Sequence, residues 1–183
     1  VELFENETKY VFNVTNLNNY NYSAKEFTPP CNYEINESGE INMTDDILGC
    51  TQDYILNITT DNVVLNCKNK KIEGDVNVSI RVSENDPLEN ITVKNCKINI
   101  TGNNGISASS ITNLFLYNNT VYTGGNYAIK FEPNVHNSII LKNSISSEFF
   151  AVYLSDSTIN NIINNTIDSR TAYAIKIEGG SYY

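Results

Sequence analysis

A short sequence pattern recurs at a fixed spacing through the second half of the chain. Its four copies begin at Gly105, Ala128, Ala151 and Ala174, and the interval between successive copies is constant. A second pattern, of the type Leu-Tyr-Asn-Asn-Thr-Val, recurs between them at nearly the same interval, beginning at Val93, Leu116, Ile140 and Ile162. Two interleaved patterns that share one period indicate a structural unit that repeats about every 23 residues.

Each copy alternates apolar and polar residues over a few positions, which is the periodicity of a β-strand. A unit of this length has no room for a helix beside two or three strands. Because such a strand cannot bury its apolar face alone, successive units must stack, and each strand must pair with its copy one unit away. We therefore predict an all-β fold, a parallel β-solenoid of about five to six coils spaced ~4.8 Å apart.

Stacking places equivalent apolar residues in columns that face the core. We expect four columns: Ile106, Ile129, Val152 and Ile175; Ala108, Phe131, Leu154 and Ile177; Val93, Leu116, Ile140 and Ile162; and Ile98, Val121, Ile145 and Ile167. Each buried aliphatic side chain contributes ~1.5–3 kcal/mol to stability. A charge in a column finds no partner, so Val152→Asp is expected to prevent folding.

Asparagines recur at the turn that follows the second pattern. Asn95, Asn118 and Asn164 fall in one column, and Asn119, Asn143 and Asn165 fall in the next. Stacked amides form hydrogen-bonded ladders, and Asn tolerates the left-handed backbone that tight turns require. We interpret these asparagines as structural.

The four cysteines are Cys31, Cys50, Cys67 and Cys96. An even number of well-separated cysteines favours disulfides and an oxidising compartment, and the absence of a C-x-x-C pair argues against a metal site. Three connectivities are possible. Cys96 lies in the second Asn column and Cys67 at the same turn one coil earlier, so we favour Cys67–Cys96 together with Cys31–Cys50.

The sequon N-x-S/T occurs 11 times, whereas the 31 Asn and the 30 Ser and Thr predict about five by chance. We interpret the excess as N-glycosylation of a secreted or cell-surface protein. The acceptor candidates are Asn6, Asn13, Asn21, Asn36, Asn42, Asn57, Asn77, Asn90, Asn99, Asn118 and Asn164. A net charge of −9 argues against a nucleic-acid partner, and the apolar runs are too short to span a membrane.

The segment from Cys31 to Gly74 and the Asn-Asn-Thr-Ile repeat at 164–167 resemble a known family. They are similar to right-handed parallel β-helix proteins of the pectate-lyase-like superfamily, in its NosD-like or carbohydrate-binding and sugar-hydrolase repeat branch, which is common on archaeal surface proteins. The resemblance covers residues 31–183 and implies a right-handed coil. It says little about activity, because the shared residues belong to turns and core.

We divide the chain into an N-terminal arm (1–30), a lead-in and cap segment (31–52) and the β-helix (53–183). The arm contains one expected strand, 10–15, and either caps its own molecule or docks on a neighbour by strand addition. Ala174 to Ile177 begins a new coil that the residues from Gly179 to Tyr183 do not close, and an uncapped solenoid end invites another chain. We therefore expect the protein to associate with itself.

The outward positions beside the core columns are the candidates for a functional site. We expect three outward columns: Gly105, Ala128, Ala151 and Ala174; Arg81, Ser107, Lys130, Tyr153 and Lys176; and Ser109, Glu132, Ser155 and Glu178. A glycosidase needs two carboxyl groups on such a face, and a lyase needs a base. The residues for either chemistry are Lys130, Glu132, Asp156, Lys176 and Glu178.

The alternative interpretation of this face is a surface of paired charges, because each lysine precedes a glutamate by two residues. We favour it, and expect a non-catalytic, extracellular structural or adhesive building block without a metal or cofactor. The second hypothesis is a carbohydrate-binding module that holds a polysaccharide through Arg81, Lys130, Glu132, Tyr153 and Lys176. The third is a polysaccharide lyase or hydrolase. His136 is expected to be a surface residue in a turn.

Overall fold

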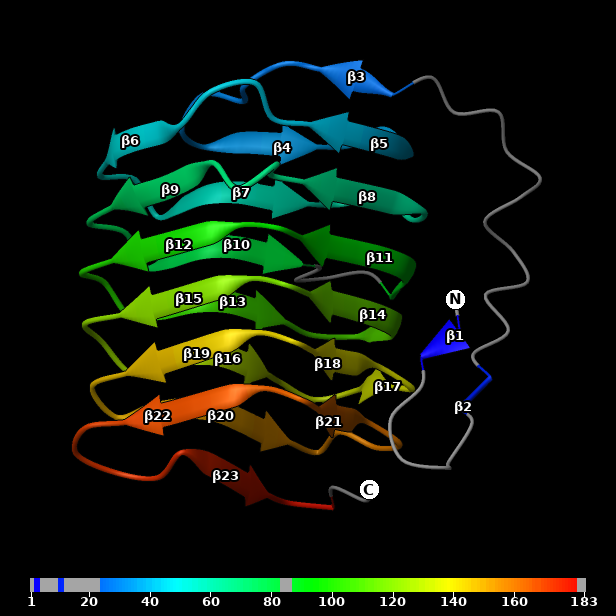
Figure 1. Ribbon diagram of the computed structural model, residues 1–183, viewed down its shortest axis with the longest axis vertical. Coiled ribbons are helices and arrows are strands. Elements are labelled where there is room, and N and C mark those ends of the chain that lie inside the picture. The colour runs from blue at the N-terminus through cyan, green and yellow to red at the C-terminus, as the bar shows by residue number, and fades with distance from the viewer. Residues whose placement is uncertain (1, 4–9, 12–23, 83–86, 181–183) are drawn as a thin grey trace.

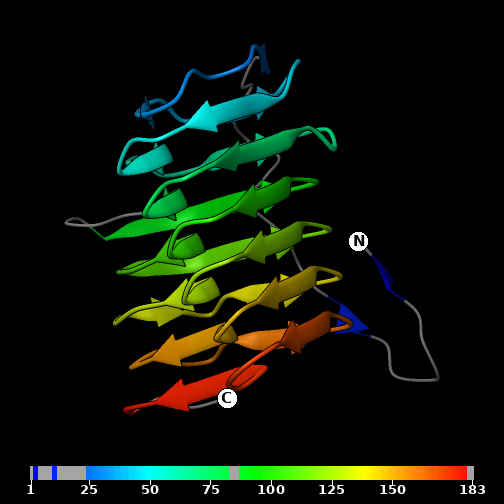
Figure 2. The same cartoon turned by 90° about the vertical axis from the view of Figure 1, so that its left-hand side faces the viewer.

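In the computed structural model, the chain winds into a rod of about six stacked coils (Figure 1). The structure describes residues 2–3, 10–11, 24–82 and 87–180, and within them it contains strands and turns but no helix. Each full coil passes through three sheets in turn, and the sheets run along the rod (Figure 2). The all-β solenoid predicted from the repeat period is confirmed.

The three sheets are named here in the order in which the chain visits them. The first sheet contains β4 (Tyr33–Ile35), β7 (Tyr54–Ile58), β10 (Val78–Val82), β13 (Asn104–Ala108), β16 (Tyr127–Phe131), β20 (Phe150–Ser155) and β23 (Ile175–Glu178). The second contains β3 (Lys25–Glu26), β5 (Gly39–Asn42), β8 (Val63–Asn66), β11 (Leu88–Lys94), β14 (Ile111–Tyr117), β18 (Ile139–Leu141) and β21 (Asn161–Ile163), with β17 (Val135–His136) beside β14. The third contains β6 (Ile47–Cys50), β9 (Lys71–Gly74), β12 (Lys97–Ile100), β15 (Thr120–Thr123), β19 (Ser144–Ser147) and β22 (Thr166–Ser169).

All neighbouring strands within these sheets are parallel, and their register is the predicted one. Ile129, for example, pairs with Ile106 on one side and Val152 on the other. The other three predicted core columns align in the same way. The side chains of these columns are fully buried in the middle coils, so a continuous apolar core runs along the inside of the rod.

Asparagine ladders line all three corners of the rod. At the turn between the second and third sheets, the Nδ2 of Asn66, Asn95 and Asn118 each donates to the Oδ1 one coil before it, beginning at Asn42. In the next coil, Lys142 occupies the position equivalent to Asn118. The predicted column of Asn95, Asn118 and Asn164 is therefore interrupted before Asn164. The predicted file of Asn119, Asn143 and Asn165 is confirmed, with Nδ2–Oδ1 distances of 3.0 Å, and Asn119 and Asn143 are buried.

Two further ladders were not predicted. Asn62, Asn90, Asn113 and Asn137 stack at the start of the second sheet. Asp53, Asn77, Asn103 and Asn126 stack at the turn into the first sheet. The side-chain amides therefore satisfy one another along each corner, which stiffens turns that the apolar core does not reach.

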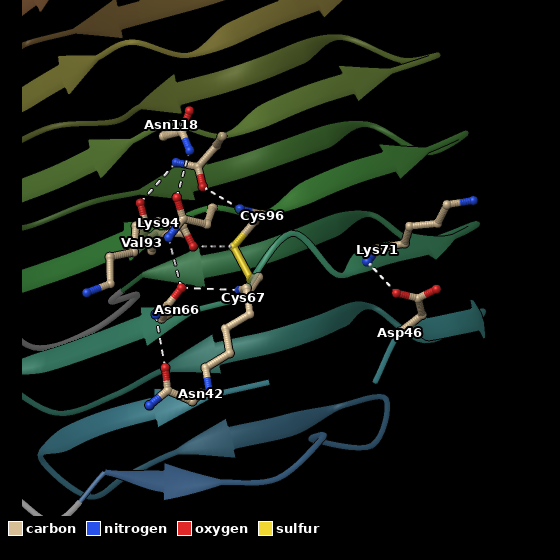
Figure 3. Close-up of a disulfide and its surroundings, with 12 residues drawn as sticks. Asn42, Asp46, Asn66, Cys67, Lys71, Val93, Lys94, Cys96 and Asn118 are labelled. Atoms are coloured by element: carbon tan, nitrogen blue, oxygen red, sulfur yellow. Dashed lines mark hydrogen bonds between the residues drawn. A yellow bond between two sulfur atoms is a disulfide. The ribbon is translucent and has the colours of Figure 1, made fainter. Parts of the chain in front are cut away.

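Both predicted disulfides are present, Cys31–Cys50 and Cys67–Cys96, with Cα–Cα distances of 5.6 and 4.8 Å. Cys67–Cys96 joins two neighbouring coils at the corner beside the Asn42–Asn118 ladder (Figure 3). The backbone N–H of Cys96 also donates to Asn119 Oδ1, so this cysteine takes the first place in the buried amide file.

The two ends of the rod differ. Segment 31–52, expected to lead into the β-helix, forms the first coil, because β4–β6 pair with β7–β9. Phe27 and Tyr33 pack edge to face over this end. At the other end, Ile175 and Ile177 of β23 are 41% and 48% exposed.

Most of the predicted arm lies outside the described residues. Within it, β1 (Glu2–Leu3) pairs antiparallel with β2 (Tyr10–Val11). Residues 12–15 of the expected strand are not described. The described part of the chain contains no helix able to cross a lipid bilayer.

Candidate functional site

The outer surface of the first sheet, from β16 to β23, carries a group of aromatic and charged side chains from the last coils. We call this surface the outer strip and define it as Tyr127, Lys130, Glu132, Phe150, Tyr153, Tyr173, Lys176 and Glu178. Parallel pairing fixes its rows, because residues one coil apart lie side by side on the same face. The predicted column Arg81, Ser107, Lys130, Tyr153 and Lys176 is in register.

One predicted column faces the wrong way. Gly105, Ala128, Ala151 and Ala174 were expected to point outward, but the first three are buried and Ala174, in the last coil, is exposed. Strands β7, β10, β13, β16 and β20 each bury two consecutive residues near their start, as β16 does with Ala128 and Ile129. The chain enters the sheet from a corner, and strict alternation fails there. A Cβ on Gly105 would lie 2.5 Å from the carbonyl oxygen of Ala128, so only glycine fits at that position without a shift of the backbone.

The outward position is therefore one residue earlier, and in the last coils it is aromatic. The ring centroids of Tyr127 and Phe150 are 5.5 Å apart with planes at 16°. Those of Phe150 and Tyr173 are 6.2 Å apart at 21°. This stack was missed, although Tyr127, Phe150 and Tyr173 recur with the period of the repeat, directly before the small residue of each copy.

Each lysine of the outer strip is held between a carboxylate and a ring. Lys130 Nζ lies 2.6 Å from Glu132 Oε1 and 5.4 Å from the Tyr127 centroid. Lys176 Nζ lies 2.5 Å from Glu178 Oε1 and 4.9 Å from the Phe150 centroid. The expected pairing of Lys with Glu two residues later is thus present in both coils.

Tyr153 closes the network in the last coil. Its hydroxyl donates to Glu178 Oε2 at 2.7 Å. Hydrogen bonds from Lys176 and Tyr153 hold the pKa of the Glu178 carboxyl below its ordinary value. The bond to Glu178 raises the pKa of the Tyr153 hydroxyl, and burial raises it further. The three groups therefore keep one another in the charge state that they have at neutral pH.

The remaining catalytic candidates lie apart from one another. Glu132 and Glu178 stand two coils apart, and Ser155, which pairs with Glu178, occupies the coil between them. Asp156 does not stand between the two glutamates on the strand, because it follows β20 in a left-handed turn. There its Oδ1 accepts from the backbone N–H of Gly180 at 3.0 Å.

Arg81, the remaining carbohydrate-binding candidate, lies toward the other end of the same sheet. Its Nη2 is 2.6 Å from Asp53 Oδ2, and its guanidinium lies 5.0 Å from the Tyr54 centroid. The hydrogen bond from Arg81 holds the pKa of the Asp53 carboxyl below its ordinary value. Arg81 thus repeats the arrangement of the lysines without belonging to the outer strip.

The other predicted residues occupy varied surroundings. His136 lies in β17, half-buried, with Nδ1 2.7 Å from Thr158 Oγ1. Among the described residues, no three His, Cys, Asp or Glu side chains are placed to hold a metal ion. The sequon asparagines Asn6, Asn13 and Asn21 lie outside the described residues. Of the others, Asn36, Asn77, Asn99, Asn118 and Asn164 are exposed, Asn90 is half-buried, and Asn42 and Asn57 are buried.

A family model described as "right handed beta helix region" matches residues 34–182 of the chain. The match covers every coil of the rod. It bears out the family resemblance and the right-handed coil, and it concerns the family as a whole rather than its NosD-like branch. No curated protein and no solved structure gave a match.

Proposed function

The chain belongs to the right-handed β-helix family, and we propose that it is a non-catalytic, glycosylated building block of an extracellular surface or filament. Two disulfides and 11 sequons support an oxidising compartment outside the cell. A rod stiffened along each corner by amide ladders is suited to bear load or to hold a fixed spacing.

One observation carries the non-catalytic part of the proposal: the polar groups of the outer strip engage one another. A general acid or base must offer its proton or lone pair to a substrate. Lys130 and Glu132 instead pair within their own coil, and Lys176 and Tyr153 both bond to Glu178. Exposed pairs of this kind are common on protein surfaces and contribute little to stability individually.

The self-association part of the proposal rests on the last described coil. Strands β21, β22 and β23 form the edges of their sheets, and an edge strand presents backbone groups that can pair with another chain. Ile175 and Ile177 add exposed apolar surface at the same end. We expect a second molecule to cover this end.

Electron microscopy and light scattering of the purified, secreted protein test the assembly. The wild type is expected to form oligomers or filaments that the double variant Ile175→Glu/Ile177→Glu loses. Ser144→Glu, at an exposed position on the side of the rod, serves as the control and should still assemble. A wild type that stays monomeric at high concentration contradicts self-association.

A panel of polysaccharides tests the absence of catalysis, and no cleavage is expected. Cleavage that disappears in Glu132→Gln or Lys130→Ala favours the lyase or hydrolase hypothesis. Both substitutions break the ion pair between Lys130 and Glu132. Lys142→Ala, which removes an exposed lysine elsewhere on the rod, is the matched control.

Carbohydrate binding without cleavage is the second candidate function. In its favour, Tyr173 ends the aromatic stack and is 65% exposed, which leaves ring surface for a sugar. Against it, Tyr127 and Phe150 turn their ring faces toward each other rather than outward. A glycan array distinguishes the two functions, since binding that is lost in Tyr173→Ala supports the module.

A further inference from the structure

One fully buried hydroxyl in the core of the rod has no hydrogen bond. Ser79, in β10, is 0% exposed, and its Oγ finds no partner among the described residues. Burying a hydroxyl without a partner destabilises a fold. Buried polar groups of this kind are rare in proteins and require an explanation.

Packing at the position of Ser79 does not require a hydroxyl group. Pairing of β10 with β13 and of β13 with β16 aligns Ser79 with Gly105 and Ala128. Ala151 follows in β20. Later coils thus fill the same buried place with glycine or alanine, which pack there without any polar atom. Alanine at 79 is therefore the residue that packing alone favours.

The sequence around Ser79 supplies a reason for the hydroxyl. Asn77-Val78-Ser79 is a sequon, in which the third residue must be Ser or Thr. Asn77 is exposed at the corner that leads into the first sheet. Its Nδ2 donates to Asp53 Oδ1 and its Oδ1 accepts from Asn103. A substituted amide keeps one N–H, so this ladder and a glycan are compatible.

We propose that Asn77 is an N-glycan acceptor, that Ser79 is retained as its recognition hydroxyl, and that Asn42 and Asn57 stay unmodified in the folded protein. This inference rests on the glycosylation in the proposed function. The glycan comes from a polyprenyl-diphosphate-linked sugar: a bond forms between Nδ2 and the anomeric carbon, and the bond from that carbon to the phosphate oxygen breaks. The amide loses one proton, and the polyprenyl diphosphate leaves.

The unmodified sites follow from burial. Asn42 and Asn57 are each only 7% exposed. Asn42 Oδ1 accepts from Asn66 within a ladder, and Asn57 lies in β7 between Glu34 and Arg81. A sugar on either amide has no room beside these neighbours. A chain modified there is expected to misfold and to be missing from the secreted product.

Site occupancy in the full chain, secreted from cells that glycosylate, tests the proposal by peptide mass spectrometry. We expect a glycan at Asn77 and none at Asn42 or Asn57. Thr101→Val, which destroys the sequon of exposed Asn99, should remove one glycan, whereas Thr59→Val, which destroys that of Asn57, should remove none. A bare Asn77 beside modified sequons, or a glycan at Asn57, overturns this inference alone. Bare asparagines throughout overturn glycosylation itself and the proposed function with it.

Ser79→Ala tests the role of the hydroxyl separately. The variant should lose the glycan at Asn77 when secreted. Made without glycans in a bacterial periplasm, it should melt about 2–4 °C above the wild type made in the same way. Ser157→Ala is the matched control, because Ser157 is equally buried but donates to the carbonyl oxygen of Ser155, and it should melt lower. A Ser79→Ala variant that melts lower than the wild type assigns the hydroxyl a structural role and overturns the proposal.

Discussion

Left-handed residues at the start of the second sheet show how single side chains stabilise the turns. Asn62, Asn90, Asn113 and Asn137 all have positive φ, between 50° and 63°, and their amides form one ladder. Asn adopts this conformation at low cost, because its short side chain bonds locally. The next residue in the file is Ile159, with φ 56°. A β-branched residue is strained there.

We predict that Ile159→Asn stabilises the protein. The substitution relieves the strain of a left-handed Ile, of order 1 kcal/mol, and adds a ladder bond to Asn137. Little burial is lost, since Ile159 is 63% exposed. The melting temperature should rise by about 2–4 °C, measured by calorimetry. Ile159→Val keeps the β-branch and should show no gain; an equal gain in both variants contradicts this explanation.

The Glu178 carboxyl gives a pH dependence with a definite sign. Its pKa is lowered in the folded protein by the hydrogen bonds from Lys176 and Tyr153. Its contribution to stability is therefore present above the unfolded value, near 4.5, and is lost as pH falls through the lower folded value. Titration by carboxyl NMR should give a midpoint below 4.5 that rises in Lys176→Met. Lys142→Met, in another turn, should leave it unchanged; a midpoint insensitive to Lys176 contradicts the pairing.

At the scale of strands, the period of the repeat correctly predicted which residues pair between neighbouring strands. It did not predict which way the side chains point where a strand begins at a corner of the rod. A fixed period aligns every strand with its copy, so the core columns could be written down from the sequence. The orientation of Ala128 could not, because alternation assumes a straight strand and the chain bends into β16 there. The same error hid the Tyr127–Phe150–Tyr173 stack. The ladders that contain Asn62 and Asn77 were also not predicted, because the early copies of the repeat are irregularly spaced in the sequence. Their asparagines are seen to align only once the strands are paired.

The Cys67–Cys96 disulfide stabilises the strands on both sides of it. It links residues 29 apart in sequence that are 0% and 1% exposed. The chain-entropy model assigns a loop of this size about 3–4 kcal/mol. We predict that Cys67→Ala/Cys96→Ala lowers the melting temperature by roughly 10 °C, measured by circular dichroism. Wild type in reductant should fall at least as far, because Cys31–Cys50 is reduced as well, and a change of only a degree or two in the double variant contradicts the prediction.

On the scale of the whole rod, stability is a sum over neighbouring coils. Each coil contacts only the ones before and after it, so the core has no centre that all strands share. The two disulfides lie in the first coils, and the ladder at Asn62 ends before Ile159. Apart from the amide file that reaches Asn165, the last coils therefore depend most on their apolar columns, although Ile175 and Ile177 are partly exposed there.

Val152→Asp tests this dependence. Val152 is fully buried between Ile129 and Ile175 in the first core column. The substitution loses about 1.5–3 kcal/mol of apolar burial and leaves an unpaired charge that costs several kcal/mol more. That total is comparable to the whole stability of a domain, about 5–15 kcal/mol. The variant should fail to fold, as seen by loss of its β-sheet circular dichroism and of its cooperative melt. Ser144→Asp, exposed on β19, should melt like the wild type. If Val152→Asp also melts like the wild type, residue 152 does not face the core, and the stacking of successive coils at the period of the repeat is wrong.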